Sequence, residues 1–166
     1  MGSASWLRHF FLFLMAWPVL AQAQWDHVEE NDYTLAATIN SDGFGLGQRC
    51  DLHAGTCKWV LATATKCALG AKHPALMNGA DSVASVTINC EGLARSSGDL
   101  YRYSIGPFDD VDSLVRASSL VGVAVALESG RFLVLRFNTA GANSELDKMR
   151  ETALRKTTSS TKSSTL

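Results

Sequence analysis

The chain carries four cysteines, and they limit its fold more than any other feature: Cys50, Cys57, Cys67 and Cys90. An even number of cysteines in an exported protein indicates disulfides, and four cysteines allow three pairings. We expect Cys50–Cys57, which closes a short turn, and Cys67–Cys90, which ties a loop to the end of a strand. Chain entropy gives about 2.5 kcal/mol for the first crosslink and about 3.4 kcal/mol for the second.

The N-terminus has the three parts of a secretory signal. Arg8 precedes an apolar run at residues 10–17, and Ala21 and Ala23 are small residues at the positions that a signal peptidase reads. A transmembrane anchor would need about 20 apolar residues, more than this run provides. We therefore predict a signal peptide at residues 1–23 and a periplasmic or secreted, bacterial protein.

The composition is that of one globular domain. The chain has 166 residues, of which 46% are hydrophobic and 19% charged, with a formal net charge of -1. This charge argues against a nucleic-acid partner, and the apolar content argues against a disordered chain. We expect one β-rich domain at residues 24–156, no membrane span after signal cleavage, and a disordered Ser/Thr-rich tail at 157–166.

Apolar alternation predicts most of the strands. The segments with this pattern are residues 33–39, 57–63, 83–90 and 100–105. The turn formers at residues 40–43 predict a hairpin between the first of them and the segment that leads to Cys50. Two nearly continuous apolar runs, 120–127 and 132–137, flank a Gly-containing turn and predict a hairpin. Because both runs lack polar alternation, we expect this hairpin in the centre of the fold, covered on both faces.

Other segments predict loops and helices. Residues 24–32 are rich in carboxylates and predict a solvated arm, and residues 64–82 contain turn formers that predict a long loop. A short helix is expected at 109–116, with Asp109 or Asp110 as its cap.

A final helix is expected to start at Asn143 or Ser144, and its apolar side is expected to carry Leu146, Met149, Ala153 and Leu154. The fold class is therefore mostly β: a compact antiparallel sandwich or partial barrel, crosslinked by disulfides, with one or two short helices.

Motifs for catalysis are missing or badly placed. There is no G-x-S-x-G elbow, and the S-x-x-K match at residues 159–162 lies in the predicted tail. His27, His53 and His73 are expected in solvated segments away from any nucleophile. We predict no catalytic residues.

No cofactor or metal site is predicted either. The acidic residues Asp109, Asp110 and Asp112 do not have the spacing of a calcium-binding loop. The glycines at 43–47 do not have the spacing of a nucleotide-binding loop. A zinc site at Cys50, His53 and Cys57 has the wrong spacing, and the compartment favours disulfides.

Aromatic and cationic residues remain as binding candidates, because such types are enriched at binding hot spots. Trp59 and Arg102 are the possible binding surface. Alternation places Arg102 opposite Tyr101 and Tyr103, so either the tyrosines or the arginine face the core. Ordinary sheet patterning favours buried tyrosines and a solvated Arg102, and favours a buried Trp59 as well.

The C-terminal hairpin, the segment 138–142 and the short helix at 145–149 resemble the end of the invasion-associated locus B family. Gly141 matches the turn of that family, and Ala142 stands where the family has an aromatic residue. The resemblance implies an exported bacterial β-sandwich with paired cysteines and no established catalysis.

These observations favour an exported, non-enzymatic binding protein whose partner is an envelope or extracellular macromolecule, expected to be a protein. The alternative is an inhibitor or immunity protein against a cell-wall hydrolase, which would insert the loop at 64–82 into a cleft. An enzyme of unrecognised type is the third hypothesis.

Overall fold

The computed structural model describes residues 24–94, 98–127 and 130–163, which form one nine-stranded antiparallel sheet and two helices. The signal peptide predicted at residues 1–23 lies outside this range. The strands are β1 Asp26–Glu29, β2 Tyr33–Ile39, β3 Gly45–Asp51, β4 Cys57–Thr63, β5 Lys72–Asn78, β6 Val83–Leu93, β7 Tyr101–Gly106, β8 Leu120–Ala126 and β9 Phe132–Asn138. The helices are α1 Phe108–Ala117 and α2 Ala142–Ser163.

The strand order is β1-β2-β3-β4-β7-β6-β5-β8-β9. The sheet bends around its own core, so that β2 and β9 contact each other although six strands lie between them in that order. The sheet does not close into a barrel. Across the remaining gap, the indole Nε1 of Trp25 donates a hydrogen bond to the Asn138 carbonyl at 3.0 Å. The predicted mostly β, antiparallel, disulfide-crosslinked fold is confirmed.

Both predicted disulfides are present. Cys50–Cys57 joins directly opposed residues of the β3–β4 hairpin, and Cys67–Cys90 ties the segment after β4 to β6. Cys50 and Cys90 are fully buried. The first crosslink therefore ties β3 to β4, and the second ties the β4–β5 connection to β6.

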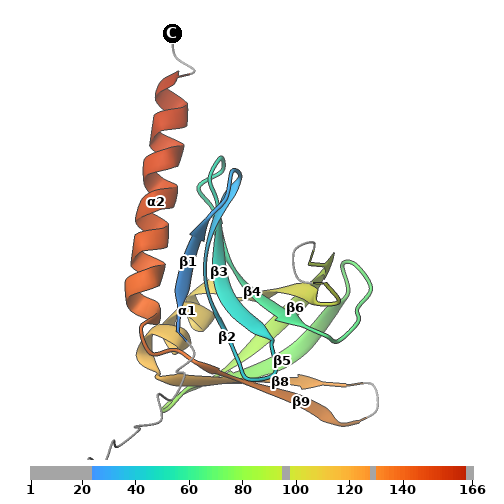
Figure 1. The fold of residues 1–166 in the computed structure, drawn as a ribbon. Helices are drawn as coiled ribbons and strands as arrows, with labels where there is room; N and C mark the ends of the chain where they lie inside the picture. Colours follow the sequence, from blue (N-terminus) through green and yellow to red (C-terminus); the bar gives the residue numbers. More distant parts are fainter. Residues whose placement is uncertain (1–23, 95–97, 128–129, 164–166) are drawn as a thin grey trace, which may run out of the picture.

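The core lies between the inner face of the sheet and the two helices. Inward side chains from β2 through β9 form one cluster with residues of both helices, among them Val111, Leu114, Leu146 and Met149. In Figure 1, α2 runs alongside β1, and α1 sits at the base of α2. Both helices therefore pack on the side of the sheet that carries the core.

Two segments expected to be irregular form strands. Residues 26–29 are β1, because Trp25 before them is 2% exposed and anchors the predicted solvated arm in the core. Residues 72–78 are β5, whose Ala75 and Met77 face the core, so a strand interrupts the predicted long loop at 64–82. Pro74 is tolerated there because it precedes the β5–β8 ladder, which begins at Ala75.

The β8–β9 hairpin is formed as expected but is not central. β9 is the last strand of the sheet, and Phe132 and Val134 are 66% and 53% exposed. The continuous apolar pattern of this hairpin therefore reflects one buried face and one apolar face that is open to solvent.

The helices differ from expectation at their ends. Pro107 caps α1 without a side-chain hydrogen bond, so neither Asp109 nor Asp110 has the predicted capping role. α2 begins at Ala142, before the predicted caps, and continues to Ser163 through the segment predicted to be a disordered tail. Thr157 helps to dock this extension, because its hydroxyl donates to the Leu52 carbonyl at 3.3 Å.

Candidate functional site

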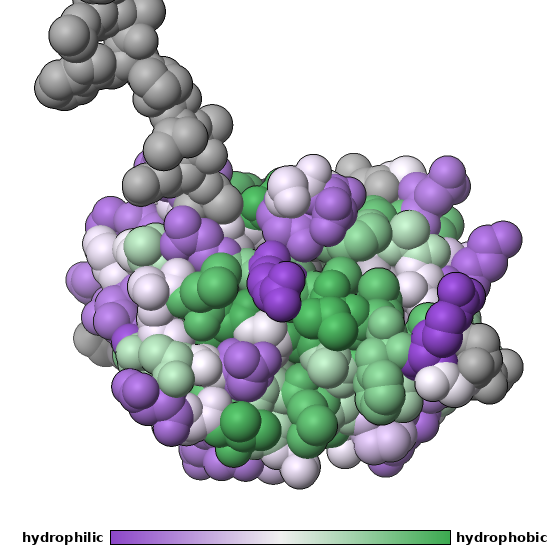
Figure 2. Space-filling model, turned by 90° about the horizontal axis from the view of Figure 1, so that it is seen from below, coloured by the Kyte–Doolittle hydropathy of each residue, from purple (hydrophilic) through white to green (hydrophobic). Residues whose placement is uncertain are grey.

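The outer face of the sheet is its uncovered surface. Strand side chains alternate, so each strand that buries one set presents the other set outward. The buried residues of both helices belong to the core on the inner face, and no helix of the described ranges packs on the outer one. Figure 2 views the molecule from below, the side of the β8–β9 hairpin, and shows apolar side chains gathered there. The outer face is therefore where a partner can reach apolar surface.

A cavity of about 220 Å³ lies on this face over β2, β3, β4 and β7, and we call it the outer groove. It exists because small residues occupy positions where a strand would otherwise carry large side chains. The small or apolar residues along its floor are Ala37, Gly45, Gly47, Val60 and Ala62, and further lining residues are Tyr33, Leu35, Ile39, Arg49, Leu100 and Arg102.

Arg49 is the most unusual residue of the outer groove. Its guanidinium carbon lies 4.0 Å from the centroid of the Tyr33 ring, a cation–π contact that fixes the plane of the group. Its Nε is buried without a hydrogen-bond partner. Within the described parts of the chain, no carboxylate forms an ion pair with Arg49. The groove therefore holds a positioned cation that has no ion-pair partner among these residues, although its charge contributes, after the backbone hydrogen bonds from Ala54 and His53, to the lowered pKa of Asp51.

Arg102, one of the two predicted binding residues, also lines the groove. Its Nε donates to Glu91 Oε2 at 2.9 Å, and Lys58 binds the other oxygen of Glu91. Burial alone would raise the pKa of Glu91, but the hydrogen bonds and charges of Lys58 and Arg102 outweigh burial and lower it. The single carboxylate of Glu91 therefore pairs with two cations. Together with Arg49, they give this part of the outer face more positive than negative side chains.

A second region of the outer face lies over β5, β8 and β9, and we call it the apolar patch: Leu76, Leu120, Ala124, Phe132 and Val134. Leu76, Ala124 and Val134 are directly opposed on three neighbouring strands, and Leu76 and Val134 are 48% and 53% exposed. Contiguous apolar surface of this kind marks interaction sites on soluble domains.

Two open hollows of about 340 Å³ each flank the row of Leu76, Ala124 and Val134. One is lined by Gly79, Gly122 and Arg136 among others, and the second by Pro74 and Phe132 among others. The patch is therefore a ridge between two depressions rather than a flat plane.

The other predicted binding residue, Trp59, lies in the core. It is 0% exposed, and its ring makes an edge-to-face contact with Trp25 at 6.3 Å between centroids. Trp59 therefore cannot touch a partner. Sequence reasoning missed Arg49 and Tyr33, although their alternation with buried residues in β2 and β3 was a usable signal.

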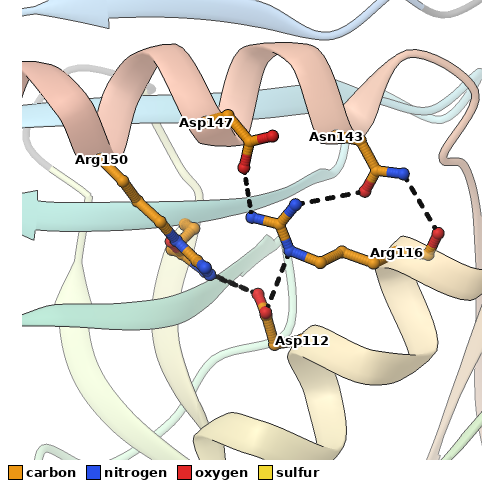
Figure 3. Close-up of polar contacts among 6 residues, drawn as sticks. Asp112, Arg116, Asn143, Asp147 and Arg150 are labelled. Carbon is orange, nitrogen blue, oxygen red and sulfur yellow. Dashed lines mark hydrogen bonds and ion pairs between the residues drawn. The ribbon is translucent and has the colours of Figure 1, made fainter.

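A cluster of charged and amide side chains joins the helices to the sheet (Figure 3). Asp112 of α1 accepts hydrogen bonds from Gln48 Nε2 at 3.2 Å and from Arg116 Nε at 3.1 Å, and it pairs with Arg150 of α2. Arg150 Nε also donates to Gln48 Oε1 at 2.7 Å.

Arg116 extends the same cluster to α2, because its guanidinium binds Asp147 at 2.9 Å and Asn143 at 3.4 Å. Burial alone would lower the pKa of Arg116, but the hydrogen bond to Asp147 and the charge of Asp112 raise it above its usual value. The ionic groups of this cluster are matched to each other, which is the arrangement of a structural joint.

Histidines of the described ranges contact other polar side chains at two places. His53 Nε2 lies 3.4 Å from Asp32 Oδ1, and both side chains are largely exposed. His27 Nε2 lies 2.7 Å from the Thr34 hydroxyl, but Thr34 is 0% exposed, so the contact holds β1 on β2 and is closed to a substrate. Among residues that the structure describes, no group of three or more His, Cys, Asp or Glu side chains could hold a metal ion. Neither helix of this described part has the length and apolarity needed to cross a membrane.

Comparisons with known protein families, curated proteins and solved structures find no match. The resemblance to invasion-associated locus B proteins therefore stays a prediction. The structure does place α2 directly after the β8–β9 hairpin, the order of elements from which the resemblance comes.

Proposed function

We propose that this protein is an exported, non-enzymatic binding protein of the envelope or the extracellular space that binds a protein partner through the apolar patch. The observation that carries the proposal is the uncovered row of Leu76, Ala124 and Val134 on three paired strands. Burying such a row on association gives a favourable free energy of roughly 25 cal/mol for each Å² of apolar surface removed from water.

The shape and charge of the patch favour a protein partner. The two hollows beside the ridge can each receive a side chain, as at interfaces with interdigitating cores. Lys72 and Arg136 border the patch as exposed cations, and no acidic residue in the described ranges forms an ion pair with either. A partner with apolar side chains rimmed by carboxylates complements this surface, whereas a second copy would bring like charges together.

Export is part of the proposal. Two disulfides in a chain of this size fit an oxidising compartment. The signal-peptide pattern at residues 1–23 supplies the route. The alternative of a hydrolase inhibitor depended on a continuous long loop at 64–82, and β5 divides that segment.

Recovery of a partner from an envelope extract tests the proposal. The bait is the mature chain, compared with the double variant Leu76→Ser, Val134→Ser and with Leu154→Ser, which changes a leucine 65% exposed on α2. We expect the wild type and Leu154→Ser to retain one and the same protein, and the double variant to lose it. Saturable binding of that purified protein then confirms the interaction.

Equal recovery with the double variant would contradict the proposal, provided that circular dichroism shows all three proteins folded. Binding of the wild type to anionic lipid vesicles, lost in the double variant and without any protein partner, would assign the patch to a membrane surface instead.

A further inference from the structure

The outer groove has a chemistry that the apolar patch lacks. We infer that it binds a single-chain anionic amphiphile, a long-chain carboxylate, whose apolar chain lies on the groove floor and whose head group binds Arg49. This site is separate from the patch over β5, β8 and β9, so the inference does not depend on the proposed protein partner.

The floor of the groove suits one hydrocarbon chain. It is made of glycine, alanine and valine residues on adjacent strands. The volume of the cavity, about 220 Å³, is smaller than the roughly 300–1,000 Å³ of pockets for drug-sized ligands. Leu35 and Ile39 of β2 and Leu100 add apolar surface. An apolar groove of this volume accepts a flexible single chain more readily than a bulky ring system.

The head group follows from Arg49. Its buried Nε lacks a hydrogen-bond partner, and leaving a buried donor unsatisfied has a free-energy cost. A carboxylate in the groove would neutralise the charge of Arg49, because the planar guanidinium matches carboxylate geometry. The stacking of Arg49 on Tyr33 at 4.0 Å holds the fork in place before the ligand arrives.

The neighbouring charges point to an anion as well. Arg102 and Lys58 share the single carboxylate of Glu91, so a second anion near them meets no repulsive excess of negative charge. A cationic amphiphile would meet three positive side chains, Arg49, Lys58 and Arg102, and is disfavoured.

A peptide is a poorer occupant than an amphiphile. The backbone groups beneath the groove are engaged in the β2–β3 and β3–β4 ladders, in which Gly45 and Gly47 are paired on both sides. An extended peptide lying on this floor would leave its own N–H and C=O groups without partners. A hydrocarbon chain has no such groups to satisfy.

Calorimetric titration of the folded mature protein with laurate, below its micelle-forming concentration, tests the inference. We expect saturable binding to one site, weakened about tenfold by Arg49→Gln, since hydrogen bonds to charged groups contribute that much. Gly45→Val should abolish binding by filling the groove, because an added Cβ there meets only ordinary contacts, 3.7 Å from Ala62 Cβ. Thr87→Val, on the outer face outside the groove, is the matched control and should bind as the wild type does.

Three results would overturn the inference: no saturable binding of laurate, equal binding of dodecyltrimethylammonium, or unchanged laurate affinity in Gly45→Val with the fold retained by circular dichroism. Binding of an apolar peptide containing Asp, by a protein that does not bind laurate, would assign the groove to a polypeptide and also overturn it.

Discussion

Gly45 and Gly47 lie on the same strand and both border the outer groove, yet their missing side chains have different consequences. A Cβ on Gly47 would come within 2.6 Å of the Ala36 carbonyl oxygen and of Ala37 Cβ. A Cβ on Gly45 would have no contact closer than 3.7 Å. Gly47 is therefore needed for the close approach of β2 and β3, and Gly45 leaves the groove open without being needed for the fold.

This difference predicts opposite effects of one substitution. Gly47→Ala should lower the free energy of unfolding by about 1–3 kcal/mol, because β2 and β3 must move apart. Gly45→Ala should leave it unchanged or raise it by about 0.5–1 kcal/mol, because alanine loses less backbone entropy. Urea denaturation measures both, and a Gly47→Ala protein as stable as the Gly45→Ala protein would contradict the packing described for β2 and β3.

Glu91 makes part of the stability dependent on pH. Its native pKa is lowered from the usual value of 4.5, with Lys58 and Arg102 outweighing the effect of burial. The stabilisation by this carboxylate is therefore complete above pH 4.5 and is lost as the pH falls through the lower native pKa. We predict that the urea midpoint of unfolding falls less steeply with decreasing pH in Glu91→Gln than in the wild type. Asp42→Asn, which changes a residue at an exposed turn, should show the same fall as the wild type.

Individual residues show how far the sequence predicts the site. Alternation correctly assigned Tyr103 to the core and Arg102 to the outer face, since neighbours along a strand face opposite sides. The same rule could not find the cation–π pair of Arg49 and Tyr33, because strand pairing brings them together from β3 and β2. Contacts across strands depend on register, which no single segment contains.

At the scale of elements, the joint between α1, α2 and β3 fixes the helices on the inner face. Asp112 lies at its centre, and its partners come from three different elements: Gln48, Arg116 and Arg150. Gln48 is 0% exposed, so a broken joint would leave a buried amide short of partners.

We therefore predict that Asp112→Ala lowers the free energy of unfolding by about 1–3 kcal/mol, because its cationic and amide partners lose their acceptor. Asp110→Ala removes an exposed carboxylate from the same helix and should change it by less than about 0.5 kcal/mol. Thermal unfolding of the two variants compares them directly, and equal midpoints would show that the cluster does not hold α1 in place.

Elements with an unbroken alternating pattern were predicted at nearly the right bounds, for example β2, β4 and β7. The strands that were missed, β1 and β5, are formed through tertiary contacts that override turn-forming or charged residues. Trp25 anchors β1, and β5 is paired on both sides, with β6 and β8. The length of α2 was missed because Ser and Thr lack helix preference, while Thr157 reaches the Leu52 carbonyl across the domain.

At the scale of the whole molecule, one bent sheet holds both helices on its inner face and leaves its outer face uncovered (Figure 1). The two disulfides lie in the middle of this arrangement, at the β3–β4 hairpin and at β6. A domain that exposes an apolar surface and contains two disulfides is suited to a compartment where thiols oxidise and a partner is present. We propose accordingly that the chain is exported, oxidised and available to bind.

The intact mass of the protein purified from the cells that make it, under non-reducing conditions and after thiol alkylation, tests this claim most directly. We predict a chain that begins at Gln24 and takes up no alkylating reagent until it is reduced, when four thiols react. A chain that still begins at Met1 and is alkylated at four cysteines without reduction would contradict it.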